Sequence, residues 1–173
     1  LDRIAGGLLV NPGFAEFLWH CRHELMLQLF KEWAETEFLE GERSEAERCI
    51  HRAVARARTP LEIADALCVL IVQYTLLAKY PQAIDAGRRA LAALGVVLPH
   101  GDFDAARDRE SAQIEEQLRQ KSPAELRDLP EMTDPVVLMV TRVLTTMGPP
   151  CYRSHPELWS VIVRFFQGGG EFM

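Results

Sequence analysis

Apolar residues return at close to helical spacing along most of the chain, and no segment has a convincing strand pattern. Between Phe14 and Leu39 this spacing predicts one long helix, or two helices with a break near His20. Proline, glycine and polar turn residues separate the later apolar stretches. The pattern therefore predicts an all-α fold of eight or nine helices.

Polar residues and prolines mark where helices begin. Ser44 with Glu47 three residues later has the spacing of a capping box, which predicts the start of a helix. Thr59 followed by Pro60 predicts the next start, because the first turn of a helix leaves the amide that proline lacks unbonded in any case. Gly95 is expected to end the helix after that one.

Small residues repeat at a fixed interval in the first half of the chain. Ala46 and Ala83 are 37 residues apart, and so are Ala53 and Ala90. Such a period is typical of stacked helix pairs, which bury their apolar faces only against neighbouring pairs. We expect a right-handed superhelical stack of antiparallel helix hairpins, an α-solenoid. The first two hairpins are expected at residues 14–58 and 60–95.

The second half of the chain is less regular, and residues 102–167 are expected to form irregular helices. A turn at residues 96–101 breaks the repeat. Asp102 or Asp104 is expected to cap a polar surface helix. Further helices are expected at 122–130, from Asp134 and Pro135 to the Gly148, Pro149 and Pro150 run, and from His155 and Pro156 to about Phe166.

Composition excludes several classes of protein. The 173 residues suit a single domain, 1–173, and 48% hydrophobic content is enough for a continuous core. The net charge of −6 and scattered basic residues provide no stripe that neutralises phosphates, so nucleic acid is not an expected partner. The apolar run at 67–72 is far shorter than the roughly 20 residues that span a bilayer. No membrane span or signal peptide is expected.

The four cysteines have wide and unpatterned spacings. Such spacing is typical of reduced, buried thiols and indicates a cytoplasmic protein. The chain begins with Leu1 and ends in a glycine-rich segment, so we expect a module of a larger protein. Apolar residues at the ends of a cut stack would allow self-association. The cysteines are Cys21, Cys49, Cys68 and Cys151.

Metal chemistry has one candidate. His20, Cys21 and His23 lie close enough in sequence to share a helix face and to hold zinc if further ligands came from elsewhere. No second pair has ligand spacing, because Cys49 and His51 would lie on different faces of a helix. We therefore expect no metal and no cofactor.

Catalytic chemistry is also weakly indicated. The carboxylate pairs Glu35 with Glu37 and Glu115 with Glu116 are expected to lie on solvated helix faces near arginines. Glycines 168–170 are not followed by the lysine and hydroxyl residue of a phosphate loop. Cys151 has only His155 nearby in sequence, which does not make a nucleophile and base. We expect no catalytic residues in this segment.

Two segments resemble the tetratricopeptide repeat. The first is the hairpin core from Trp33 to Gly41 with Ala46 after it, and the second runs from Tyr80 through Pro81 to Ala83 and Ile84. In the second hairpin Tyr74 and Tyr80 take the aromatic places of the repeat, while Ala83 and Ala90 take its small ones. The resemblance covers about residues 25–166 and implies a helical stack that binds protein.

A more specific resemblance rests on the segment from residue 83 to Pro99 and on Leu129 to Pro135. These segments are similar to the helical region behind the AAA or STAND ATPase domain of very large signalling proteins. Such proteins often carry kinase-like, GAF and histidine kinase or cyclase domains. The resemblance implies a noncatalytic regulatory scaffold that relays between an ATPase switch and an output domain and contacts flanking domains or a signalling partner.

The partner-binding face is expected on the concave side of the stack. Lys31 takes one place of the carboxylate clamp found in some tetratricopeptide proteins, but Glu35 and Val69 take two others, so this clamp is not expected. A stand-alone adaptor, and an all-helical enzyme or small-ligand binder with a deep internal pocket, remain as alternatives. The residues expected on the concave face are Gln28, Lys31, Glu35, Asp65, Cys68, Val72 and Thr75.

Overall fold

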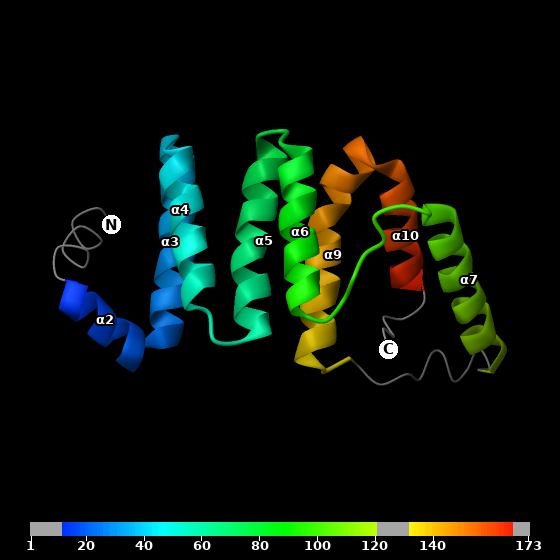
Figure 1. Cartoon of the computed structure of the whole chain (residues 1–173), viewed down its shortest axis with the longest axis horizontal. Helices are drawn as coiled ribbons and strands as arrows, with labels where there is room; N and C mark the ends of the chain where they lie inside the picture. Colours follow the sequence, from blue (N-terminus) through cyan, green and yellow to red (C-terminus); the bar gives the residue numbers. More distant parts are fainter. Residues whose placement is uncertain (1–11, 121–131, 168–173) are drawn as a thin grey trace.

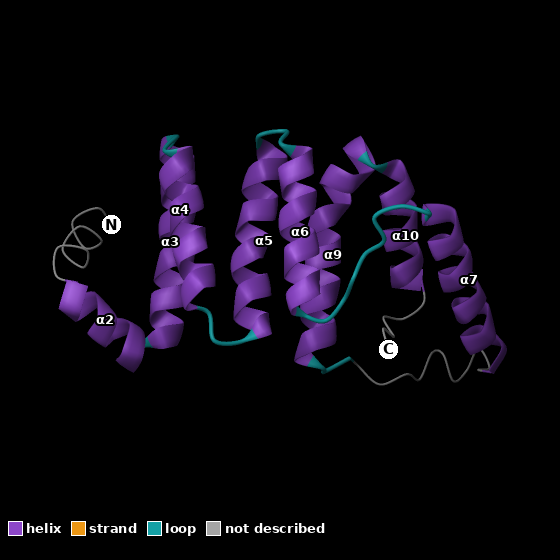
Figure 2. Ribbon diagram, in the orientation of Figure 1, coloured by secondary structure: helices purple, strands orange, loops and turns teal. Residues whose placement is uncertain are grey.

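The computed structural model describes residues 12–120 and 132–167. Within these ranges the chain forms helices joined by loops and turns, without a strand, which confirms the all-α prediction (Figure 2). The predicted helix at 122–130 lies outside the described residues. The helices are α2 (Pro12–Cys21), α3 (His23–Glu40), α4 (Arg43–Arg56), α5 (Pro60–Leu76), α6 (Tyr80–Ala93), α7 (Phe103–Gln120), α9 (Pro135–Ser154) and α10 (Pro156–Gln167).

Consecutive helices pack in pairs, and the pairs stand side by side along the long axis of the molecule (Figure 1). α3 packs on α4, α5 on α6 and α9 on α10. The pairs meet through contacts of α5 with α3 and α4, and of α9 with α5 and α6. α7 covers α10 at one end of the row, and α2 contacts α3 at the other. The third pair, α9 with α10, belongs to the part of the sequence for which only irregular helices were expected.

Apolar and small residues fill the spaces between the pairs. Ala46, Ala53, Ala83 and Ala90, the alanines of the sequence repeat, are fully buried. Small side chains at these positions let neighbouring helices approach closely, and larger residues such as Ile71 fill the remaining space. The core is one continuous cluster that runs from α2 to α10.

Several predicted helix boundaries are confirmed. The Thr59 hydroxyl accepts a hydrogen bond from the Glu62 amide, and the Glu62 carboxylate accepts one from the Thr59 amide, which completes a capping box before Pro60. The Asp134 carboxylate accepts from the Val136 amide at 2.7 Å and so caps α9.

Glycine ends α3 and follows the end of α6. Gly41 and Gly95 have φ of 93° and 84°, and each lies in open space. Glycine adopts this left-handed conformation without the steric penalty that a Cβ brings. Each turn is closed by a hydrogen bond from the next residue back into the helix, from Glu42 N to Glu37 O at 2.8 Å and from Val96 N to Leu91 O at 2.9 Å.

Two predicted boundaries are wrong. α4 begins at Arg43 without a side-chain cap, so Ser44 and Glu47 do not form the predicted capping box. The reversal after Gly41 is so tight that Glu42 both closes α3 and accepts the first α4 hydrogen bond, from Ala46 N to its carbonyl at 3.0 Å.

The second wrong boundary is the end of α9. Pro149 and Pro150 lie inside this helix, which continues to Ser154 instead of ending at Gly148. Met147 and Cys151, one on each side of the prolines, are fully buried. Packing on both sides of the prolines therefore holds the segment helical despite the missing amides.

Candidate protein-interaction face

The first helices of the three pairs form one face of the molecule. α5 contacts both α3 and α9, whereas α3 and α9 do not contact each other, so α5 is the middle helix of this face. A hollow of about 390 Å³ crosses the face and receives side chains from all three helices. We call it the α5 hollow. It is lined by Glu35, Phe38, Leu39, Cys68, Val69, Val72, Gln73, Leu76, Arg142 and Thr146.

The α5 hollow is mainly apolar. Leu39, Val72 and Leu76 leave 85%, 47% and 69% of their surface exposed. Single exposed apolar side chains are common on protein surfaces and need no explanation. Several of them around one hollow form an apolar patch, and such patches are typical of contact surfaces.

A shared carboxylate joins the three helices beside the hollow. Lys31 Nζ of α3 donates to Asp65 Oδ2 at 2.5 Å, and Arg142 Nη1 of α9 donates to Asp65 Oδ1 at 2.6 Å. The Asp65 side chain on α5 is 23% exposed, so solvent screens these pairs less than it would on an open surface. The Asp65 carboxylate thus bridges the first helices of three consecutive pairs.

A hydrogen bond from a buried side-chain amide also links α5 to α3. Gln73 is buried and donates from Nε2 to the Ala34 carbonyl of α3 at 3.1 Å. A buried amide that loses such a partner costs free energy, so this contact favours one register of α5 against α3.

Cys68 lies in the wall of the hollow and is nearly completely buried. Burial raises the pKa of its thiol to about 11, although Arg142 and a hydrogen bond with Thr146 act in the opposite direction. The thiol is therefore protonated at neutral pH, and the thiolate is the nucleophilic form. This cysteine contributes packing to the hollow.

The structure brings together five of the seven residues predicted for the concave face. Glu35, Cys68 and Val72 line the α5 hollow, and Lys31 and Asp65 form the ion pair beside it.

The other two predicted residues lie outside the lining of the hollow. Gln28 is exposed and donates to Glu32 Oε1 at 2.5 Å on the same helix. The Thr75 hydroxyl donates to the Ile71 carbonyl of its own helix at 2.6 Å.

Sequence reasoning missed the contribution of α9 to the hollow, namely Arg142 and Thr146. The signal was present, because Asp134 and Pro135 correctly predict the start of this helix. Because the sequence repeat ends before α9, the sequence pattern gives no indication that residues of this helix lie beside those of α3 and α5.

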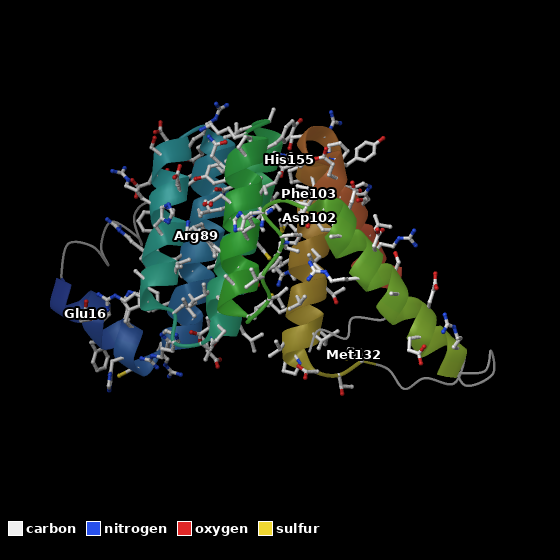
Figure 3. The ribbon with its side chains drawn as sticks, turned by 45° about the vertical axis from the view of Figure 1, so that its right-hand side comes forward. Glu16, Arg89, Asp102, Phe103, Met132 and His155 are labelled. Atoms are coloured by element: carbon white, nitrogen blue, oxygen red, sulfur yellow. The ribbon has the colours of Figure 1, made fainter. Side chains whose placement is uncertain are left out.

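A second, polar hollow of about 290 Å³ lies at the α2 end of the molecule. Glu16, labelled on α2 in Figure 3, pairs with Arg56 of α4 there. His20 and His23, the candidate zinc ligands, both line it, but His23 Nε2 lies 3.1 Å from the Glu62 carboxylate. Among the described residues no three metal-ligating side chains converge.

The carboxylate pairs considered as acid and base have separate surroundings. Glu115 and Glu116 are exposed on α7 and both pair with Arg119, as predicted. Glu37 differs from the prediction because it is buried and accepts a 2.6 Å hydrogen bond from the Trp33 indole. The indole N–H supplies the hydrogen bond that a buried carboxylate needs in the helix interface.

The prediction that all four cysteines are buried is wrong for one of them. Cys49 and Cys151 are buried, but Cys21 is exposed. Burial raises the pKa of Cys49 to about 11 and that of Cys151 to about 12. His155, labelled in Figure 3 between α9 and α10, has its Nδ1 3.0 Å from the Ser154 hydroxyl.

Over the described ranges, no helix has the length and apolar character needed to cross a bilayer. Over residues 12–120 and 132–167 the fold is all-helical, and its consecutive helix pairs create a mainly apolar hollow. Searches of protein-family models, curated proteins and solved structures found no match to this chain.

Proposed function

We propose that this chain is a noncatalytic protein-interaction module built as a tetratricopeptide-like α-solenoid, and that it binds protein through the face formed by α3, α5 and α9. The observation that carries the proposal is the α5 hollow, which three helices from three consecutive pairs line jointly. An open hollow with exposed leucine and valine side chains fits a segment of another protein.

The proposal includes a regulatory role in a multidomain signal-transduction protein. The module would relay between an ATPase switch and a histidine kinase or cyclase output in the cytoplasm. Its support is the resemblance of residues 83–99 and 129–135 to such signalling proteins, together with the ion pairs at Asp65 that link α3, α5 and α9. Contact at one helix pair would then change the position of the next.

Photo-crosslinking in the intact protein tests the binding face. A photoreactive amino acid replaces Val72, which is exposed in the hollow, and in a matched variant replaces Gln82, which is exposed on α6. We expect irradiation of the Val72 variant to give crosslinks to a flanking domain or to a second protein, and the Gln82 variant to lack them. Equal products from both positions, or none from Val72, would overturn the proposed face.

The size of the native polypeptide tests the multidomain setting. On a denaturing blot, an antibody against this 19.6 kDa chain should detect a band several times larger. A band close to the mass of the chain would contradict the signalling context and leave a stand-alone adaptor.

A further inference from the structure

We infer that the α5 hollow selects a peptide segment that lies across α5 and carries an apolar side chain between a basic residue on the α3 side and an acidic residue on the α9 side. This inference rests on the proposed function and adds the chemistry of the partner. It follows from the different charges that the two outer helices place at the hollow.

The apolar anchor follows from the apolar lining of the hollow. Val69, Val72 and Leu76 line it from α5, and Leu39 lines it from α3. Leu39 leaves 85% of its surface to water and Leu76 leaves 69%. Burying such surface under an apolar side chain of a partner is favourable at about 25 cal/mol for each Å². A leucine- or phenylalanine-sized residue suits a hollow of about 390 Å³ that is open on one side.

The basic residue follows from Glu35 on α3. Its side chain is exposed and lines the hollow. Within the described part of the chain, no side chain or backbone amide donates to its carboxylate. Lys31 lies one helical turn away, but its Nζ donates to Asp65 Oδ2 at 2.5 Å and its side chain is only 19% exposed. An incoming lysine or arginine would therefore find this carboxylate available.

The acidic residue follows from Arg142 on α9. Nη1 donates to Asp65, and the side chain is 57% exposed. Across residues 12–120 and 132–167, Nε and Nη2 have no acceptor, so one edge of the guanidinium remains for a carboxylate of a partner. Asp65 already neutralises Lys31, which leaves the positive charge of Arg142 only partly balanced.

The direction of the segment follows from the order of the helices. Glu35 and Arg142 come from α3 and α9, which lie on either side of α5 and do not touch. The four charges of Lys31, Glu35, Asp65 and Arg142 sum to zero. The hollow therefore distinguishes the order of charges along a segment, and its net charge matters less.

Selection from a random-peptide phage library on the immobilised chain tests the inference, with affinities then measured for fluorescein-labelled synthetic peptides. We expect enriched peptides with an apolar residue between a basic and an acidic one. Binding should be two- to fivefold weaker, about one exposed ion pair, when either charge is replaced by glutamine, and weaker still when the two charges are exchanged.

Three variants assign each part of the preference. Glu35→Gln should abolish the preference for the basic residue only, Arg142→Gln that for the acidic residue only, and Val72→Asp should remove binding. Glu40→Gln and Arg153→Gln change exposed charges of α3 and α9 outside the hollow and should have no effect. Thermal melts confirm that each variant is folded.

Two outcomes would overturn the inference. One is enriched peptides whose charge preference neither Glu35→Gln nor Arg142→Gln changes. The other is enrichment that survives in the folded Val72→Asp variant. If Val72 still crosslinks to protein in the intact chain, the inference fails and the proposed interaction face stands. If neither crosslinks nor enriched peptides appear, both fail.

Discussion

Gly87 of α6 faces the side chain of Met147 on α9, and a Cβ at position 87 would lie 2.3 Å from the Met147 Sδ. Met147 is fully buried, so it has no solvent into which it can move. The close packing of the second helix pair against the third therefore depends on a residue without a side chain. This relationship also gives a physical reason for a glycine inside a helix, where helix propensity alone would favour alanine by about 1 kcal/mol.

We predict that Gly87→Ala destabilises the chain. Overpacking a core costs about 1–3 kcal/mol, and alanine gains about 1 kcal/mol of helix propensity, so a net loss of up to about 2 kcal/mol is expected. Urea denaturation followed by circular dichroism measures the change. Gly101→Ala, where an added Cβ meets nothing within 4 Å, is the control and should be nearly neutral.

A double mutant identifies the cause of this loss. If Met147 is responsible, Gly87→Ala combined with Met147→Ala should cost less than the sum of the two single changes. A Gly87→Ala variant as stable as the wild type would show that α6 and α9 adjust freely, contrary to our prediction.

Removing the shared carboxylate should weaken the alignment of the three helices. Asp65→Asn leaves Lys31 and Arg142 without a common counter-ion, and we expect a loss of about 1 kcal/mol of unfolding free energy. High salt should reduce this difference because it screens the original pairs. Glu115→Gln, which breaks an exposed pair on α7, should cost less. Equal effects of the two changes would show that the Asp65 pairs are ordinary surface pairs.

Glu62 should make stability depend on pH on the acid side. Burial tends to raise the pKa of this carboxyl, but hydrogen bonds from the Arg58 amide, His23 and the Thr59 amide outweigh it, and the pKa lies below its usual 4.5. A lowered folded-state pKa means that the stabilisation is complete above about pH 4.5 and is lost as pH falls through the folded-state value.

Unfolding free energies from about pH 7 to about pH 3 measure this contribution. We expect Glu62→Gln to be less stable than the wild type at neutral pH, with the difference shrinking toward low pH. Glu157→Gln, at an exposed position in the first turn of α10, is the control. A difference between Glu62→Gln and the wild type that does not change with pH would contradict the prediction.

Thiol labelling should separate the cysteines into two classes. Cys21 is exposed, whereas Cys49, Cys68 and Cys151 are buried and have raised pKa values, so iodoacetamide should modify Cys21 first in the native chain. Mass spectrometry should show one added group under native conditions and four after denaturation. Rapid native modification of Cys68 would indicate that the α5 hollow opens far more than the structure implies.

The candidate face could be predicted only in part. The sequence could predict four residues of the face, because helical spacing places them on one side of α3 and α5: Lys31, Glu35, Asp65 and Val72. It could not predict Arg142, because 77 residues separate Arg142 from Asp65. Local periodicity assigns a residue to a face of its own helix, but it does not say which distant helix will pack beside that face.

The amino-acid sequence by itself determined the helical class and those boundaries that depend on neighbouring residues. Thr59 with Pro60, and Asp134 at the start of α9, act through hydrogen bonds within one helical turn, and Gly95 needs only its own backbone conformation. Such signals are complete in the local sequence, so the corresponding predictions were correct.

Tertiary structure decided the features in which local rules and packing compete. Pro149 and Pro150 would end an isolated helix, yet burial of Met147 and Cys151 on either side keeps α9 continuous. Glu37 should have been solvated, but the Trp33 indole supplies the hydrogen bond that burial requires. In both cases the free energy depends on contacts that exist only once the helices have packed together, and a single segment of sequence does not contain them.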